Sequence, residues 1–259
     1  MATIHIASAG VVPPLLSARD ALYLDFDGTL TDIAPRPDAV AIAQTLPPLL
    51  DALRMLLGGA VAIVTGRRLD DIDTWLAPLR LAGAGLHGAE LRRTPDADSF
   101  EHRVPAAPLI ARSLMERFGS DPRLIVENKG ASVALHFRAA PERGDECAAA
   151  MAELAAAHGL GAIAGKMVVE ARPPGVDKGS AIRALASDPP FRGRRPVFVG
   201  DDVTDEDGFA AVQAEGGVGI KVGERTGAAH YNCADVGAVH AWLDASLLHL
   251  RQSPRRIHG

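Results

Sequence analysis

Residues Ala21–Leu30 read ALYLDFDGTL. The first six of them, through Phe26, form a short and nearly continuous apolar run, as expected of a parallel strand that is covered on both faces. The run ends in two carboxylates, Asp25 and Asp27. Ligands of open parallel sheets bind outside the carboxyl ends of the strands, so this segment predicts a polar site at the sheet edge.

Two further buried strands also end in polar residues. VAIVT at Val61–Thr65 is followed by Gly-Arg, and PVFVG at Pro196–Gly200 is followed by five acidic residues in seven positions. Between such strands lie segments with leucines at helical spacing, such as residues 46–57 and 69–79. Alternating strands and helices predict an α/β fold built on a Rossmann-like, open and mostly parallel sheet.

Residues 106–172 break this rhythm. Two helices and four short strands are expected there, at residues 109–118, 123–128, 131–138, 142–158, 162–164 and 166–171. The turn-like Asn128-Lys129-Gly130 joins the first two strands. We therefore predict a discontinuous core domain of residues 1–105 and 173–259, with an inserted α+β cap domain at 106–172.

The composition excludes several classes of protein. The 259 residues are 47% hydrophobic and 23% charged with a net charge of -5, and they contain no basic stripe, which disfavours nucleic acid as a partner. No apolar run is long enough to span a membrane, and the first residues lack the pattern of a secretory signal peptide. Cys147 and Cys233 match no metal or redox spacing. We expect a cytoplasmic monomer with no membrane partner.

The acidic residues at the strand ends favour a metal site. If the carboxylates of Asp25 and Asp27 converge, they repel each other unless a cation lies between them. Mg²⁺ is the cation that most commonly binds such oxygen ligands. The alternative is that these acids only cap a turn, because Asp-Gly is a common turn pair. Three other segments support the metal: Thr65 at a strand end, Lys178 before a helix, and the acidic run from Asp201.

These four segments resemble the motifs of the haloacid dehalogenase superfamily of phosphatases. Those motifs are an Asp-x-Asp-x-Thr loop, a strand-terminal Ser/Thr, a Lys, and a Gly-Asp-x-x-x-Asp loop; here they are Asp25–Thr29, Thr65, Lys178 and Asp201–Asp205. The insertion lies where that superfamily carries its larger caps. Within the superfamily, LDFDGTL, VTGR, LHGAE, VENKGASVALHFR, EARPPGVDKG and GDDVTDEDGF are similar to the trehalose-6-phosphate phosphatase family.

The resemblance implies a catalytic set and a cofactor. Asp25 would be the nucleophile that forms an aspartyl-phosphate, Asp27 the general acid and base, and Thr65 and Lys178 the holders of phosphoryl oxygens. Mg²⁺ would be the cofactor. Its candidate ligands are Asp25, Asp27 through its main-chain carbonyl, and Asp201, with Asp202 and Asp205 either as ligands or as supports of Lys178 and the metal waters.

The candidate substrate-binding residues come from both domains. From the core they are Gly28, Thr29, Gly66, Arg67 and His87, and from the cap Glu127, Arg138, Lys166 and Glu170. Alternation places Lys166 and Glu170 on one face of their strand. The resemblance implies that the four cap positions bind the disaccharide. They would otherwise be a solvated sheet face, and His87 is equally compatible with a structural role.

The function implied by the resemblance is hydrolysis of the small phosphosugar trehalose 6-phosphate, the last step of trehalose biosynthesis. Alternatives within the superfamily are phosphatases of sucrose phosphate or mannosyl-phosphoglycerate. A phosphomutase would need a dense Arg/Lys cluster in the cap, which the sequence lacks. A catalytically silent regulatory module is disfavoured because it would need no nucleophile at Asp25.

Overall fold

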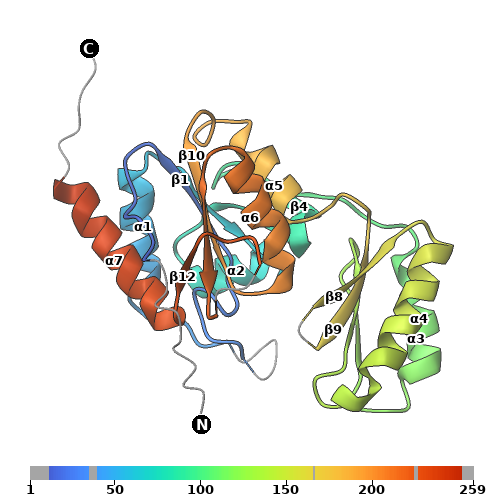
Figure 1. Cartoon of the computed structure of the whole chain (residues 1–259). Helices are drawn as coiled ribbons and strands as arrows, with labels where there is room; N and C mark the ends of the chain where they lie inside the picture. The colour runs from blue at the N-terminus through green and yellow to red at the C-terminus, as the bar shows by residue number, and fades with distance from the viewer. Residues whose placement is uncertain (1–11, 35–39, 166, 225–226, 253–259) are drawn as a thin grey trace, which may run out of the picture.

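The computed structural model describes residues 12–34, 40–165, 167–224 and 227–252 and contains two sheets (Figure 1). In spatial order, the larger sheet consists of β12 (Tyr231–Cys233), β11 (Val218–Val222), β10 (Arg195–Gly200), β1 (Asp20–Leu24), β2 (Val61–Val64), β3 (Ala82–Gly85), β4 (Glu90–Arg92) and β5 (Phe100–Glu101). The strands from β12 to β3 are parallel, and β4 and β5 add an antiparallel edge. The predicted α/β fold with an open, mostly parallel sheet is confirmed.

Helices cover both faces of the larger sheet. Those on one face are α1 (Leu46–Leu56), α2 (Leu69–Leu76) and α7 (Val236–Gln252), and those on the other are α5 (Lys178–Ala186) and α6 (Glu206–Ala214). Alternate residues of β1 serve the two faces, because Leu22 and Leu24 pack in the first layer and Tyr23 in the second. Every residue of β1 is buried, which explains the apolar run Ala21–Leu24 that follows Asp20.

The smaller sheet is antiparallel and forms a separate layer with two helices. Its strands, in order, are β6 (Ile125–Asn128), β7 (Val133–His136), β9 (Val168–Arg172) and β8 (Gly161–Gly165), and its helices are α3 (Ala107–Phe118) and α4 (Gly144–Ala157). The side chains of Val133, Leu135 and Val169 pack against the helices. Because side chains alternate along a strand, the residues next to these three, such as Ala134 and Glu170, face away from the helices. We call this unit the cap; its assignment as a substrate-specificity domain stays a prediction.

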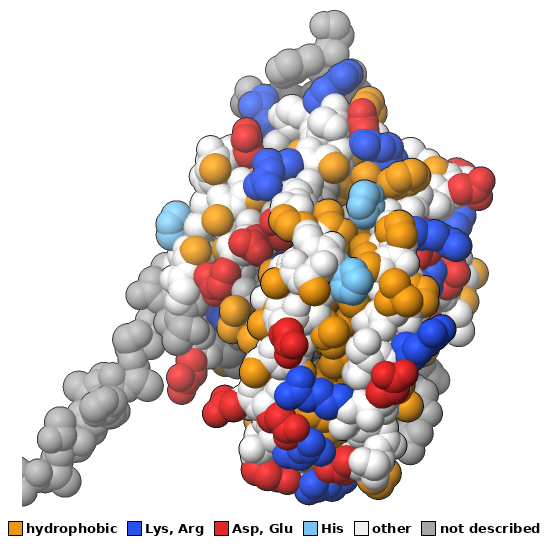
Figure 2. Space-filling view, turned by 90° about the vertical axis from the view of Figure 1, so that its right-hand side faces the viewer, with side chains coloured by type: hydrophobic (Ala, Val, Ile, Leu, Met, Phe, Trp, Pro, Cys, Tyr) orange, Lys and Arg blue, Asp and Glu red, His pale blue; other side chains and the backbone are white. Residues whose placement is uncertain are grey.

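The outer face of the cap mixes both signs of charge. Figure 2 shows Lys and Arg side chains interspersed with Asp and Glu, with hydrophobic side chains between them.

Within the described ranges, no helix has the length and apolarity to cross a membrane. Cys147 and Cys233 are both buried free thiols.

The structure corrects several expected boundaries. The helix expected over residues 69–79 ends at Leu76, shortly before Pro78, which cannot continue a helix hydrogen-bond ladder. The strand expected from Lys166 begins at Val168, and Lys166 itself lies outside the described residues. β4, β5 and β12 were not predicted because strands of two or three residues carry too little periodicity.

Candidate active site

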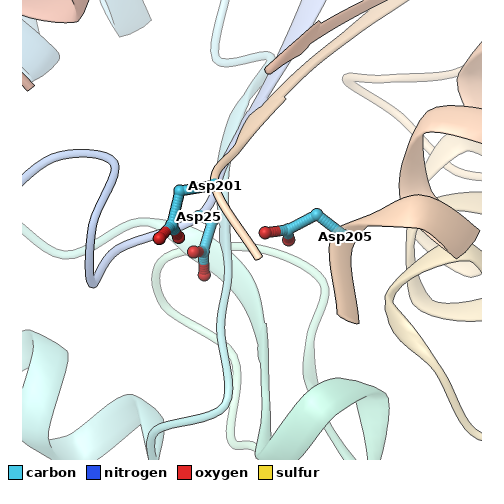
Figure 3. Close-up of side chains that lie close together, drawn as sticks. All are labelled: Asp25, Asp201 and Asp205. Carbon is cyan, nitrogen blue, oxygen red and sulfur yellow. The ribbon is translucent and has the colours of Figure 1, made fainter. Parts of the chain in front are cut away.

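Three carboxylates meet at the carboxyl ends of the central strands. Asp25 follows β1, while Asp201 and Asp205 follow the adjacent β10 (Figure 3). One carboxylate oxygen from each lies within 4.8 Å of the other two. The side chain of Asp205 is fully buried, and Asp25 is 4% exposed. The strand order therefore brings two distant sequence motifs together into one acidic cluster, in which Asp25 and Asp205 are buried and Asp201 is half-buried.

Gly28 makes room for this cluster. Its φ is +74°, in the left-handed region, and a Cβ placed there would collide with the carboxylate of Asp201. The chain turns back at this point, since the Gly28 N–H donates to the carbonyl of Thr31 at 2.7 Å. Glycine is thus required both for the turn and for the approach of the second acidic loop.

Lys178 supplies the positive charge of the cluster. As the first residue of α5 it is 2% exposed, and its Nζ lies 2.8 Å from Asp25 Oδ1 and 2.6 Å from Asp205 Oδ1. Asp177 fixes the start of the helix, because its carboxylate accepts a hydrogen bond from the Ser180 N–H at 2.6 Å. The capped helix therefore directs the ammonium group between two carboxylates.

The charges in the cluster shift its pKa values. Burial raises the pKa of Asp25 well above its usual range, although the Lys178 ammonium opposes this. Burial and the charge of Asp205 raise the pKa of Asp201 to about 6. Burial alone would lower the pKa of Lys178, but Asp205 and Asp25 raise it above its ordinary value. With three acids and one ammonium, the cluster is suited to a hard divalent cation.

Asp27 lies beside this cluster, and its carboxylate contacts Arg67. Arg67 Nε and one terminal nitrogen donate to the two oxygens of Asp27 at 2.6 and 2.7 Å. The guanidinium also lies 4.6 Å from the ring centroid of Trp75. Arg67, predicted as a substrate ligand, thus orients Asp27 in this structure.

The two candidate hydroxyl groups are both buried. Thr65 Oγ1 accepts a hydrogen bond from the Arg67 N–H at 3.2 Å. Thr29 Oγ1 has no hydrogen-bond partner among the residues that the structure describes. A buried hydroxyl without a partner is costly, and a water molecule or an ion that binds beside it removes this cost.

The structure separates Asp202 from Asp205, which the sequence left equivalent. The Asp202 carboxylate accepts a hydrogen bond from the Val203 N–H at 2.7 Å, so it caps a turn. Asp205 accepts from the Asp202 N–H at 2.9 Å and from Lys178. Of these two acids, only Asp205 belongs to the acidic cluster.

Two of the predicted cap residues share one face of the cap sheet. Glu127 is paired with Ala134, which is paired in turn with Glu170, so these residues form one row across three strands. The row lies on the face opposite the helices. Glu127 contacts His136 at 2.9 Å. Beyond β7, Arg138 donates to the carbonyl of Ala34 in the core at 3.0 Å.

Among the three predicted cap residues that the structure describes, Glu170 is the most buried. It is 7% exposed and contacts His87 Nε2 at 3.1 Å, Lys129 Nζ at 3.4 Å and the Ser132 hydroxyl. Burial alone would raise the pKa of Glu170, but His87, Lys129 and the hydrogen bond from Ser132 hold it well below its usual range. This carboxylate is therefore a charged contact between cap and core.

Sequence reasoning missed Lys129. Its Nζ lies 3.4 Å from the carbonyl of Gly66 as well as from Glu170, so it also bridges cap and core. Arg68 holds the same turn, donating to the carbonyl of Lys129 at 3.0 Å. The available signal was the position of Lys129 in a tight turn two residues after Glu127.

Comparisons with known proteins agree on one family. The trehalose-phosphatase family model matches residues 23–236. A probable trehalose-phosphate phosphatase of Sinorhizobium fredii is 45% identical over 211 residues, covering 78% of this chain and 77% of that protein. The trehalose-6-phosphate phosphatase of Escherichia coli is 37% identical over 244 residues, or 92% of this chain and 91% of that protein.

A solved structure extends the likeness to the fold. The C-terminal domain of Candida albicans trehalose-6-phosphate phosphatase aligns with a TM-score of 0.79 at 21% identity. The alignment covers 93% of this chain and 99% of that one. The architecture of core and cap together is therefore shared with that structure.

Proposed function

The chain belongs to the trehalose-phosphatase family, and we therefore propose that it hydrolyses trehalose 6-phosphate to trehalose and phosphate through an aspartyl-phosphate on Asp25. The observation that carries the mechanism is the buried Asp25 carboxylate at the end of β1, within 2.8 Å of Lys178. Two more acids complete its surroundings. A carboxylate beside an ammonium group suits attack on a phosphoryl group, because the phosphoryl oxygens are themselves negatively charged.

The acidic cluster fits Mg²⁺. Three carboxylate oxygens lie within 4.8 Å of one another, and hard oxygen donors are the ligands that Mg²⁺ prefers. Asp25 and Asp201 would hold the ion, together with the main-chain carbonyl of Asp27, and Asp205 lies close enough to contribute. When bound, Mg²⁺ would neutralise phosphate oxygens and so reduce their repulsion of the Asp25 carboxylate.

Each step of the proposed hydrolysis can then be assigned to a residue. Asp25 attacks phosphorus, the bond from phosphorus to the sugar oxygen breaks, and Asp27 donates a proton to that oxygen. Asp27 next takes a proton from the water that attacks the aspartyl-phosphate, which releases phosphate and restores Asp25. Arg67 holds the Asp27 carboxylate in position. Lys178 and Thr65 would stabilise the phosphoryl oxygens, where charge gathers in the transition state.

The cap would select the substrate. Glu127 and Glu170 lie in one row on the face opposite the cap helices, and Arg138 reaches the core at Ala34. Charged groups of both signs suit a sugar, whose hydroxyls both donate and accept hydrogen bonds. Contacts to the glucose units would add binding energy that positions the phosphate on Asp25. This arrangement supports a disaccharide phosphate over a small phosphate ester.

Phosphate release across a panel of esters tests the proposal. The panel contains trehalose 6-phosphate, sucrose 6-phosphate, glucose 6-phosphate and p-nitrophenyl phosphate, each with Mg²⁺ and with EDTA. We expect trehalose 6-phosphate to have the highest kcat/KM and EDTA to abolish turnover reversibly. A preference for sucrose phosphate would contradict the substrate, and no release from any ester would indicate a silent module.

A further inference from the structure

Glu170 lies on the cap sheet, but its carboxylate points to the core. Its partner there is His87, whose Nε2 lies 3.1 Å from Glu170 Oε2. His87 follows β3 and belongs to the core, so the contact joins residues 83 positions apart in the chain. A buried carboxylate needs partners for its charge, and among the core residues that the structure describes, His87 is the one that contacts Glu170.

The backbone of His87 is tied to the loop that would grip phosphate. The His87 N–H donates to the carbonyl of Thr65 at 2.9 Å, and the Leu86 N–H donates to that of Arg67 at 2.9 Å. Both residues adopt left-handed backbones, with φ values of 54° for His87 and 51° for Leu86. Such conformations are costly for residues other than glycine, and they concentrate at functional sites.

The imidazole ring packs against the same loop. A Cβ at Gly66 would lie 2.5 Å from His87 Nε2, so glycine at this position is what lets the ring approach. Burial lowers the pKa of His87, although the charge of Glu170 opposes this. Because a carboxylate can only accept a hydrogen bond, the contact requires a proton on Nε2 of His87. Nδ1 is buried without a hydrogen-bond partner in the described part of the chain. The side chain is therefore arranged around its contact with Glu170.

We propose that His87 is a positioning residue that fixes Glu170, and with it Lys129, above the loop of residues 65–67 when the cap lies on the core. Lys129 follows because its Nζ contacts both Glu170 and the carbonyl of Gly66, each at 3.4 Å. The inference rests on the proposed function in that Glu170 would contact the sugar. His87 itself acts through Glu170.

Two substitutions of His87 separate the loss of the contact with Glu170 from a change in the backbone conformation. Asparagine tolerates the left-handed region, so His87→Asn should keep the turn, but its shorter amide cannot reach Glu170. His87→Gln places a nitrogen near the position of Nε2 and should retain most of the contact. We expect His87→Asn to lower kcat/KM for trehalose 6-phosphate by about 10- to 100-fold, as for a lost hydrogen bond to a charged group, and His87→Gln to lower it much less.

A double-mutant cycle tests whether His87 acts through Glu170. If it does, His87→Asn combined with Glu170→Gln will be no worse than Glu170→Gln alone. His158→Asn is the matched control, since His158 is exposed at the end of α4. Losses that multiply in the double mutant would overturn the proposal, because they would show that His87 acts independently of Glu170.

A second measurement needs no substrate. Amide hydrogen exchange in the turn of residues 127–133 should be several-fold faster in substrate-free His87→Asn than in the wild type or His158→Asn. Unchanged exchange would overturn the proposal. If the wild-type protein releases no phosphate from trehalose 6-phosphate, the proposed function fails, and the exchange experiment alone decides the role of His87.

Discussion

Replacing Asp201 by asparagine should stabilise the metal-free protein while removing its response to Mg²⁺. The side chain differs by one charge and keeps its shape. In the folded protein, burial and Asp205 raise the pKa of Asp201 from 3.8 to about 6. The folded state therefore penalises the charged carboxylate, and this penalty is what the substitution removes.

The direction of the expected change in stability follows from proton linkage. Since the folded pKa lies above 3.8, the stabilisation from the protonated form is complete below pH 3.8 and is lost as the pH rises through about 6. The difference between the ordinary pKa of 3.8 and the folded pKa of about 6 corresponds to about 3 kcal/mol, which solvent screening at this partly exposed group reduces to about 1–2 kcal/mol. For a chain of this size, that amounts to roughly 2–8 °C in Tm.

Thermal unfolding in EDTA measures the effect. At about pH 7.5, Asp201→Asn should have the higher Tm, and at about pH 5 the difference should shrink because the wild-type carboxyl is then mostly protonated. Mg²⁺ should raise the Tm of the wild type but not that of Asp201→Asn. Asp244→Asn, at an exposed position on α7, is the control and should change neither value. A Tm for Asp201→Asn below that of the wild type at pH 7.5 in EDTA would refute this reasoning.

Three other predictions concern turnover. Asp25→Asn should keep the circular dichroism spectrum of the folded protein but release phosphate at less than a few per cent of the wild-type rate, because an amide does not attack phosphorus; a higher rate with undeamidated protein would reject Asp25 as the nucleophile. Ca²⁺ should inhibit the Mg²⁺-activated enzyme in phosphate-release assays, since its larger and looser coordination disturbs in-line geometry, and activation by Ca²⁺ would count against the metal assignment. Arg138→Ala should lower kcat/KM for trehalose 6-phosphate by about 10- to 150-fold and affect p-nitrophenyl phosphate much less, whereas Lys178→Ala should damage both; equal losses in Arg138→Ala would make that residue structural.

The core of the fold was predictable because its strands are buried on both faces. β1, β2 and β10 each contain an apolar run of at least four residues that is followed by polar residues. Their order in the sheet brings Asp25 beside Asp201, as the positions at strand ends predicted. The edge strands β4 and β5 were not predictable, because their pairing depends on contacts outside their own short sequences.

The roles of individual side chains depend on contacts that no local pattern reveals. Asp202 and Asp205 are both acids of one loop, and only the backbone turn decides that Asp202 caps it while Asp205 meets Lys178. Arg67 and Asp27 are 40 positions apart, and their pairing follows from the adjacency of β1 and β2. The burial of Glu170 against the core likewise follows from how the cap lies on it.

The central claim is that trehalose 6-phosphate transfers its phosphoryl group to Asp25. Acid quenching of the enzyme during turnover, followed by peptide mapping, measures this directly, because acyl phosphates survive brief exposure to cold acid. We predict a phosphoryl group on the peptide that contains Asp25, formed from trehalose 6-phosphate in the presence of Mg²⁺ and absent in Asp25→Asn. A phosphoryl group on another residue, or turnover of trehalose 6-phosphate by Asp25→Asn, would contradict the account.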